Sequence, residues 1–447
     1  MDFISNIEYN KFSDGGINML DIKFVREHSE EVKENIKKKF QDKKLPLVDE
    51  VIELDKRIRE LKTEGDLLRQ ERNTTSDEIG ALFREKKVDE ANAKKTRVVE
   101  INEKLVDIEK EEEKLSGLLK EKMMTIPNMI ADDVPIGEDD SCNVEEAVFG
   151  EAKIPEYEIP YHSDIMASFN GLDKEAAGRV SGNGFYYLMG DIARLHSAVL
   201  AYARDFMIDK GFTYCIPPFM IHGDAVNGVM SFEEKDAMMY KIEGEDLYLI
   251  GTSEHSMIAK FKDQLLNESE LPITMTSYSP CFRKEVGAHG IEERGVYRIH
   301  QFEKQEMIVI CRPEDSEAWY EKMWNYSVEL FRSLDIPVRK LVCCSGDLAD
   351  LKYRSCDIEA WSPRQQKYFE VCSCSNLTDA QARRLAIRYK KQNGEKEFAH
   401  TLNNTVIAPP RMLIAFLENN LQEDGSVLIP VALRPYMGGK EKLIPNK

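Results

Sequence analysis

The stretch RKEVGAHGIEERGVYRIHQFEKQE, residues 283–306, decides the fold of this chain. It joins two segments with period-two alternation, 273–285 and 296–311, through a glycine-containing loop. This pattern predicts a long antiparallel β-hairpin. The hairpin gathers arginines and histidines although the whole chain has a formal net charge of -19. We therefore interpret it as a candidate binding site for an anionic ligand.

Length and composition limit the possible classes of protein. A chain of 447 residues is too long for one ordinary core and predicts two or three domains. The negative net charge argues against indiscriminate binding to nucleic acids or membranes. No apolar run approaches the ~18–20 residues of a membrane span. Residues 1–18 lack the basic start and apolar core of a signal peptide, and we interpret them as a natural extension or a tag remnant.

The cysteines indicate a reducing environment. Their number, nine, is odd, and in a chain of this size a disulfide framework is not expected, so the sequence predicts a cytoplasmic protein. Two groups, Cys343-Cys344 and Cys372-x-Cys374, suggest either a metal site or buried core residues. Their spacing differs from the C-x2-C of structural zinc sites, which favours the core interpretation.

Residues 51–119 carry two coiled-coil seams. Apolar or small residues recur in 3-4 alternation over 51–82 and again over 98–119, and the charged segment 84–95 lies between them. Two seams joined by a polar reversal predict an antiparallel helical hairpin. Helices of about 30–35 residues would be roughly 45–50 Å long. The periodicity alone fits a coiled-coil dimerisation arm equally well.

Basic residues are frequent on this hairpin, but acidic residues are interleaved, so a solvated helix surface is the default interpretation of each. Lysines at a protruding tip could still contact phosphates, because counterion release depends on local charge. The basic residues are Lys56, Arg57, Arg59, Lys62, Arg69, Arg72, Lys86, Lys87, Lys94, Lys95 and Arg97.

Pro127 and Pro135 end the helical part and divide the chain. We predict a helical arm over 19–124, a linker over 125–142 and a second domain over 143–447. In the second domain the patterns predict helices at 194–211 and 381–391, strands at 212–221, 246–255 and 358–376, and a strand followed by a helix at 400–421. Mixed helices and antiparallel strands without a βαβ period indicate an α+β domain.

The order of motifs resembles one family, the seryl-tRNA synthetases of class II, in their archaeal-like branch. FRKE and RIHQFEKQE resemble the second signature motif of the class, GFTYCIPPFMI the first, and HTLNNT followed by Arg411 the third. GTSEH and EVCSCSN add two further matches. The resemblance covers almost the whole chain, including the helical arm. It implies an antiparallel sheet domain flanked by helices behind an N-terminal antiparallel coiled-coil hairpin.

The resemblance also implies a function. A serine–tRNA ligase activates L-serine with ATP to seryl-adenylate and transfers it to tRNA(Ser), and by resemblance to tRNA(Sec) as well. The expected partners are ATP with Mg²⁺, L-serine, tRNA bound by the 50–118 arm and the 286–295 loop, and a second copy in a homodimer. Activation needs positioning and positive charge rather than a general base.

Site residues follow from the matching motif positions. Arg283 and Arg411 are the expected catalytic residues. The resemblance assigns serine binding to Thr252, Ser253, Glu254, Arg283, Glu306, Asn403 and Thr405. It assigns ATP binding to Arg283, Lys284, Glu285, Arg298, Ile299, Phe302, Glu370, Val371, Cys372, Ser373 and Arg411. Glu370 and Ser373 are the expected ligands of magnesium, which favours oxygen donors.

Three features depart from the family pattern. Asn404 stands where bacterial relatives usually have glycine, Pro409-Pro410 precede Arg411, and Glu292-Glu293 place two acids where relatives usually have one. The prolines put the position of Arg411 in question, although proline suits a first helical turn. Pro409-Pro410 and Glu292-Glu293 support an alternative, a degenerate paralogue that binds tRNA or nucleotide without productive aminoacylation.

Overall fold

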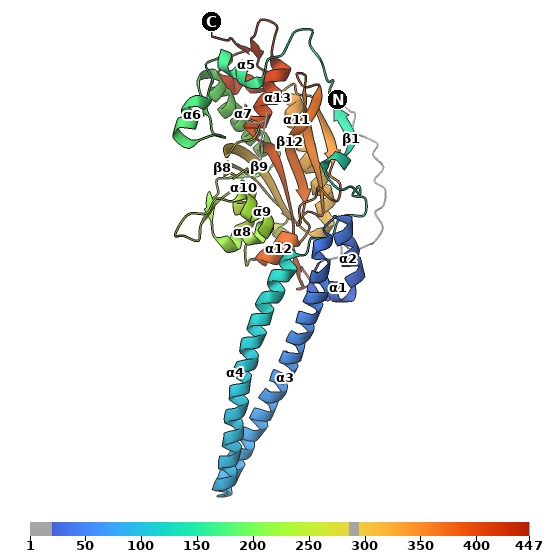
Figure 1. Cartoon of the computed structure of the whole chain (residues 1–447), viewed down its shortest axis with the longest axis vertical. Helices are drawn as coiled ribbons and strands as arrows, with labels where there is room; N and C mark the ends of the chain where they lie inside the picture. The colour runs from blue at the N-terminus through green and yellow to red at the C-terminus, as the bar shows by residue number, and fades with distance from the viewer. Residues whose placement is uncertain (1–19, 286–294, 447) are drawn as a thin grey trace.

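The computed structural model describes residues 20–285 and 295–446 of the chain. It consists of a helical arm and a larger α+β domain built on a sheet, as the sequence predicts (Figure 1). The possible extension or tag remnant at 1–18 lies outside the described residues.

The arm consists of α3 (Leu45–Arg84) and α4 (Val88–Thr125), which run antiparallel away from the sheet domain (Figure 1). With 40 and 38 residues they are longer than predicted, roughly 60 Å each. The sequence predicts a reversal over 84–95, but most of that segment is helical. Its lysine, glutamate and alanine residues favour helix, and the reversal needs only 85–87, where Lys86 adopts a positive φ of 61°.

The seam of the arm is apolar, as its periodicity predicts. Leu61 and Leu68 of α3 pack against Ile101, Leu105 and Ile108 of α4. Ion pairs between the helices flank this seam: Arg57–Glu111 at 3.1 Å, Arg69–Glu109 at 3.3 Å and Arg97–Glu71 at 2.8 Å. Several predicted phosphate contacts therefore have partners inside the arm.

The root of the arm is fixed to the sheet domain. Helices α1 (Ile22–Glu27) and α2 (Ser29–Lys38) pack beside α3 and share an apolar cluster with it. Lys44 forms an ion pair of 2.6 Å with Asp350, and the Lys39 ammonium donates to the carbonyl of Ala349 at 3.0 Å. The arm thus has an anchored base and a projecting tip.

The predicted linker packs on the sheet domain. Ala131 and Val134 form a small apolar cluster with Cys343 and Leu348. The amide of Asn128 donates to the carbonyls of Leu351 and Leu377 at 3.2 and 3.1 Å. This connection fixes the position of the arm relative to the larger domain.

An eight-stranded sheet forms the frame of that domain, in the order β1-β10-β11-β12-β15-β9-β8-β4. Neighbouring strands are antiparallel except β4 and β8, which run parallel. The predicted hairpin is β8–β9, paired from Ile273–Ile310 to Phe282–Gln301. The strands are β1 (Val144–Phe149), β4 (Thr213–Cys215), β8 (Ile273–Phe282), β9 (Gln301–Cys311), β10 (Val338–Val342), β11 (Arg354–Ser362), β12 (Lys367–Asn376) and β15 (His400–Ile407).

The two faces of the sheet differ. Met307 and Val309 of β9 join the main core, whereas Ile308 and Ile310 join a second core on the other face, because side chains alternate along a strand. Helices α7 (Gly190–Asp209), α11 (Ser316–Ser333) and α13 (Pro409–Asn420) contribute to the main core. Helices α10 (Ser253–Ala259) and α12 (Ala380–Leu385) contribute to the second.

Two predicted elements were partly wrong. In the predicted strand 246–255, only Tyr248–Leu249 are extended, and Thr252 caps α10 by accepting from the Glu254 amide. The predicted helix 381–391 ends at Leu385, because Ala386 adopts a left-handed φ of 55° and β13 follows. The remaining elements are α5 (His162–Ser168), α6 (Lys174–Ser181), α8 (Gly223–Val229), α9 (Phe232–Met238), β2 (Leu172–Asp173), β3 (Tyr187–Leu188), β5 (Met220–Ile221), β6 (Tyr248–Leu249), β7 (Leu265–Asn267), β13 (Arg388–Lys390), β14 (Lys396–Phe398), β16 (Val427–Leu428) and β17 (Lys442–Leu443).

Candidate active site

Two adjoining cavities contain most of the predicted site residues. The Arg411 cavity, of about 150 Å³, is lined by Arg283, Glu285, Tyr297, Arg298, Ile299, Phe302, Lys304, Glu370, Val371, Thr405, Ala408, Pro410 and Arg411. The Glu306 cavity, of about 290 Å³, includes Thr252, Glu254, Glu306, Asn403, Ser373 and Lys352 in its lining.

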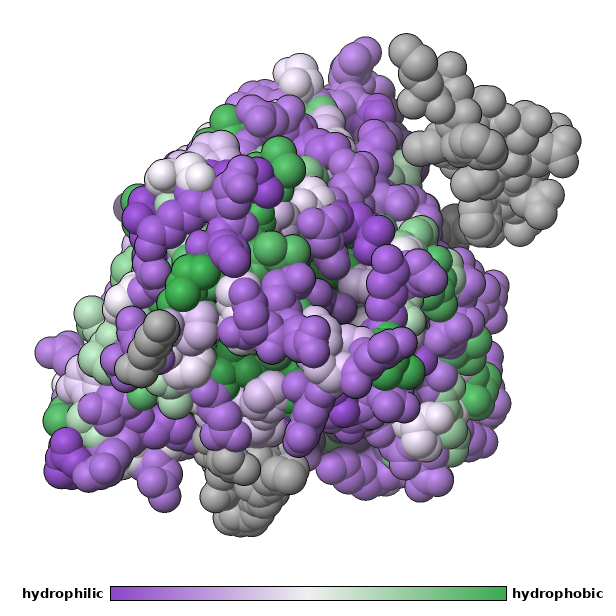
Figure 2. All heavy atoms as spheres, turned by 90° about the horizontal axis from the view of Figure 1, so that it is seen from above, coloured by the Kyte–Doolittle hydropathy of each residue, from purple (hydrophilic) through white to green (hydrophobic). Residues whose placement is uncertain are grey.

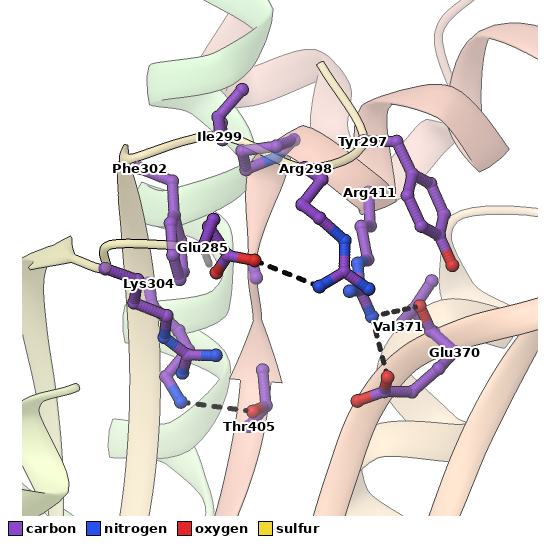
Figure 3. A pocket seen from close by; sticks show the side chains of 13 residues that line it. Glu285, Tyr297, Arg298, Ile299, Phe302, Lys304, Glu370, Val371, Thr405 and Arg411 are labelled. Atoms are coloured by element: carbon purple, nitrogen blue, oxygen red, sulfur yellow. Dashed lines mark hydrogen bonds and ion pairs between the residues drawn. The ribbon is translucent and has the colours of Figure 1, made fainter. Parts of the chain in front are cut away.

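The Arg411 cavity combines a flat aromatic surface with several cations. The Arg283 guanidinium carbon lies 5.2 Å from the centre of the Phe302 ring. Arg298 donates to the Glu285 carboxylate at 3.1 Å (Figure 3). Arg411 donates to the Glu370 carboxylate at 2.7 Å, and its guanidinium carbon lies 4.6 Å from the centre of the Tyr297 ring (Figure 3). A planar base and a polyanion fit this lining.

The departures near the third motif are compatible with this geometry. Pro409 and Pro410 occupy the first turn of α13, where no intrahelical N–H donor is needed, and Arg411 follows them into the cavity. The Asn404 amide donates to the Met323 carbonyl and to Ser327, both at 2.9 Å, on the opposite face of the sheet from the cavities. Glu292-Glu293 lie outside the described residues.

A bulge in β12 brings Glu370 and Ser373 to the same cavity. Residues three apart on a regular strand point to opposite faces. In β12 the pairing shifts, so that Ile358 and Glu359 of β11 face Cys372 and Glu370, and Val371 is the extra residue. Burial is the largest single effect and raises the pKa of Glu370. The charge and hydrogen bond of Arg411, with the charges of Lys352 and Arg283, together outweigh burial and lower that pKa. An ionised carboxylate and a hydroxyl on one wall fit the oxygen ligands of magnesium.

The Glu306 cavity has a buried carboxylate at its centre. Glu306 is 1% exposed, forms an ion pair with Lys304, and accepts from the Thr252 hydroxyl at 3.0 Å. Lys304 also donates to Thr405 at 3.4 Å (Figure 3). Thr405 faces Glu306 directly across the β15–β9 ladder. The polar groups can recognise a small ligand that carries both an ammonium and a hydroxyl group.

Glu254 provides a second carboxylate in the same cavity. Burial, and then repulsion from Glu306, raise its pKa to about 7. Beside it His255 is buried, and burial, with the charges of Arg283 and Lys304, lowers its pKa to about 3. His255 is therefore neutral at neutral pH. A cationic ligand between Glu254 and Glu306 would relieve their repulsion.

Four residues line both cavities: Arg283, Lys304, Glu370 and Thr405. They form the boundary at which a ligand in one cavity would contact a ligand in the other. Two of them are cations, and Arg283 donates through Nε to the Gly251 carbonyl at 3.2 Å. The two cations suit a reaction between the two ligands whose transition state carries negative charge at this boundary.

Some predicted residues line neither cavity. Ser253 is fully buried and accepts from Ser277 at 2.6 Å, Lys284 donates to the Asp236 carbonyl at 3.3 Å, and the Cys372 thiol faces the Val406 carbonyl within the main core. Strand alternation explains Cys372, whose side chain is on the apolar face of β12. The assignment of these three residues to the site stays a prediction. Residues 286–294 of the predicted tRNA loop lie outside the described residues.

Four side chains at or beside the cavities are absent from the predicted set. Lys304 had a usable signal, because alternation along β9 puts it on the same face as Phe302 and Glu306. Tyr297 precedes the strand, and its contact with Arg411 depends on the loop conformation. Lys352 donates to Ser373 at 3.4 Å, and Gln381 donates to Glu254 at 2.8 Å. Both come from distant segments that only the tertiary structure brings close.

The four cysteines of the two groups singled out by the sequence are buried. All nine cysteines are free, and Cys343, Cys344, Cys372 and Cys374 are each at most 3% exposed, as the core interpretation predicts. Among the described residues, the group with metal-ligand spacing is Cys343, Asp347 and Asp357.

In the described part of the chain, none of the helices combines the length and apolarity needed to cross a bilayer.

Family models and solved structures match this architecture. Residues 19–130 match the seryl-tRNA synthetase N-terminal domain, and residues 238–420 match the tRNA synthetase class II core domain (G, H, P, S and T). A seryl-tRNA synthetase from Pyrococcus horikoshii complexed with ATP superposes with a TM-score of 0.91 at 38% identity, covering 96% of this chain and all of that chain. A cytoplasmic serine–tRNA ligase from Naegleria fowleri in complex with AMP gives 0.85 at 33% identity, covering 96% and 100%.

Curated relatives agree over nearly the full length. A serine–tRNA ligase from the archaeon Methanoculleus marisnigri is 40% identical over 427 residues, which cover 95% of this chain and all of the relative. The Pyrococcus horikoshii ligase is 40% identical over 447 residues, covering 95% of this chain and 97% of the relative. The chain therefore belongs to the seryl-tRNA synthetase family of class II aminoacyl-tRNA synthetases.

Proposed function

We propose that this chain is a serine–tRNA ligase, with ATP in the Arg411 cavity and L-serine in the Glu306 cavity. The observation that carries the proposal is the boundary shared by the cavities. Arg283 and Lys304 lie where a serine carboxylate oxygen would attack the α-phosphorus of ATP and release pyrophosphate. In the second step a terminal ribose hydroxyl of tRNA would attack the seryl carbonyl and release AMP.

The protein contributes charge and position to these steps. Phe302 offers a stacking face for adenine, and Glu285, held by Arg298, can accept from the exocyclic amine. Arg283 can form a planar two-point contact with phosphate or carboxylate, which a lysine does poorly. Arg411 supplies charge toward the triphosphate. When bound, magnesium would offset phosphate charge, and we assign Glu370 and Ser373 to hold it.

Serine recognition is assigned to the polar lining of the Glu306 cavity. Glu306 and Glu254 can accept from the serine ammonium, and Thr252, Asn403 and Thr405 add hydroxyl and amide groups around the side chain. A cavity that hydrogen-bonds the substrate hydroxyl should reject alanine by about 10⁴–10⁵-fold, because its buried polar groups would otherwise lack partners. We assign specificity for serine to this set of contacts.

We assign tRNA binding to the arm, with domain boundaries at 19–124, 125–142 and 143–447. Since Arg57, Arg69 and Arg97 form ion pairs across the arm, we place the phosphate contacts nearer the tip, at Lys86 and Lys95. The Lys95 ammonium lies 4.6 Å from the centre of the Phe83 ring, and both residues are exposed. Double-stranded RNA is recognised largely by shape and backbone, which suits a rigid charged rod.

We further propose a homodimer in the cytoplasm. Strand β4 is an edge of the sheet, and three exposed apolar side chains lie close to it in sequence: Ile208, Ile216 and Met220. Seen from the end opposite the arm, the surface is mainly hydrophilic with hydrophobic groups between (Figure 2). We assign the two-fold interface to the β4 edge. Nine free cysteines support a reducing compartment.

Serine-dependent ATP–pyrophosphate exchange tests the first step, and charging of tRNA(Ser) tests the second. Alanine and threonine are the matched control substrates. Exchange that requires serine, together with charging of tRNA(Ser), would support the proposal. Binding of tRNA without exchange would instead support the degenerate paralogue. Exchange with alanine at a comparable rate would contradict the assigned specificity.

A further inference from the structure

Helix α12 (Ala380–Leu385) contacts the Glu306 cavity from outside its lining. Two of its side chains carry the contacts. Gln381 is fully buried and reaches the carboxylate of Glu254, while Arg384 reaches the end of α8 and the end of the arm helix α4. Neither side chain lines the cavity. Their hydrogen bonds nevertheless hold groups that do.

The Gln381 amide is fixed in one orientation by its three partners. Its nitrogen donates to Glu254 Oε1 at 2.8 Å and to the Val229 carbonyl at 3.1 Å, and its oxygen accepts from the Thr401 hydroxyl at 2.7 Å. A flipped amide would set its oxygen against a carboxylate and a carbonyl, which are both acceptors. The network therefore specifies a donor pointing at Glu254.

This donor is needed because the surroundings of Glu254 destabilise its ionised carboxylate. Burial of Glu254 penalises its ionised form, and the charge of Glu306 then repels it. Both effects raise the pKa of Glu254. The charges of Lys304 and Lys352 act on Glu254 only at longer range, whereas Gln381 contacts it directly. Removing the amide donor would leave the carboxylate oxygen free to turn away from a bound ammonium.

Arg384 has a parallel role on the backbone. Within the described residues, all its side-chain hydrogen bonds go to backbone carbonyls: Asn227 at 3.3 Å, Met230 at 2.9 Å, and Met124 in the last turn of α4. Val229 and Met230 line the Glu306 cavity. Arg384 therefore fixes one wall of that cavity and joins it to the root of the arm.

We propose that α12 positions the serine pocket, Gln381 by orienting the Glu254 carboxylate and Arg384 by fixing the 227–230 backbone. The inference rests on the proposed serine–tRNA ligase function and adds two positioning residues to it. Neither residue lines the Arg411 cavity or the Glu306 cavity. Their loss should change the use of serine while leaving the use of ATP almost unaltered.

Steady-state pyrophosphate exchange with Gln381→Met, Glu254→Gln and the double variant tests this. Methionine keeps the volume and removes the donor. We expect the serine KM of Q381M to rise about 10–100-fold, as for a hydrogen bond to a charged group, with the ATP KM changed less than about twofold. In the E254Q background the amide oxygen can still accept from Gln381, but only as a neutral hydrogen bond, so the same change should add a smaller factor, about two- to tenfold.

Thr401→Val provides a milder second variant, since it keeps Gln381 and removes only the donor that fixes its orientation. It should raise the serine KM in the same direction by a smaller factor. Arg384→Lys, which keeps the charge but loses the planar fork, should also raise the serine KM selectively. Equal rises in the serine and ATP KM values, or full additivity of Q381M with E254Q, would overturn the inference. Absence of serine-dependent exchange in the unmodified enzyme would instead overturn the proposed function.

Discussion

Replacing Glu254 with glutamine should stabilise the enzyme in alkaline solution while impairing serine activation. The pKa of Glu254 is raised from 4.5 to about 7 in the folded protein. When folding raises the pKa of a group, that group contributes its full stability at pH values below its pKa in the unfolded chain. The contribution is lost as the pH rises through its pKa in the folded protein. At pH 5 the native carboxyl is mainly protonated and resembles an amide. Above pH 8 it is ionised, enclosed in the cavity and close to Glu306.

The expected gain in free energy of unfolding follows from the size of the pKa shift of Glu254. A difference of about 2.5 pKa units corresponds to about 3 kcal/mol at high pH, taken as an upper bound. The variant should therefore exceed the unmodified protein in free energy of unfolding by less than about 1 kcal/mol near pH 5 and by up to about 3 kcal/mol near pH 8.5. The amide oxygen introduced by E254Q can still accept from Gln381, so the substitution preserves that contact.

Urea unfolding followed by tryptophan fluorescence measures the difference, without substrates and at one protein concentration. The three tryptophans, Trp319, Trp324 and Trp361, all lie in the sheet domain, so the signal reports on that domain and not on the arm. Glu243→Gln, at an exposed position, controls for the loss of one negative charge. A stability difference between E254Q and the unmodified protein that is the same at pH 5 and pH 8.5 would refute the reasoning.

Four further predictions concern the proposed function. Arg283→Ala should lower serine-dependent exchange by at least about 10²–10³-fold with thermal unfolding little changed, and half-normal exchange would contradict its role. Glu306→Gln should abolish serine activation yet bind ATP normally in calorimetric titration, whereas Glu306→Ala would also destabilise the fold by leaving Lys304 buried without its partner. Deleting residues 58–110 and joining Arg57 to Glu111, whose side chains are 3.1 Å apart, by a short Gly-Ser linker should preserve exchange and lower tRNA charging by orders of magnitude. Lys86→Ala/Lys95→Ala in the full chain should weaken tRNA binding and reduce its salt dependence, and near-normal charging by the deletion variant would contradict the role of the arm.

Periodic patterns predicted the framework of the molecule well. The β8–β9 hairpin and the two arm helices depend on local alternation and on seam residues such as Leu61 and Ile101, which the sequence displays directly. Local features also caused the errors. A left-handed residue at Ala386 ended α12 early, and nothing in the helical pattern of 381–391 signals it.

Site residues on regular strands were likewise predictable, and those that depend on irregular geometry were not. Phe302 and Glu306 follow from their motif and share a strand face. Ser373 shares a cavity with Glu370 only because of the bulge at Val371, and the same register explains why Cys372 faces the core. Gln381 and Lys352 enter the site through contacts between segments far apart in sequence, which no single-sequence pattern contains.

The anchored arm also has a mechanical consequence, because a rod fixed at one end is a lever. Its helices extend roughly 60 Å from the root. A rotation of about 5° at the root would move the tip by about 5 Å, while an atom one helix diameter, about 10 Å, from the pivot would move less than about 1 Å. The tip can thus follow a bound RNA over several ångströms while the backbone held by Arg384 is almost undisturbed.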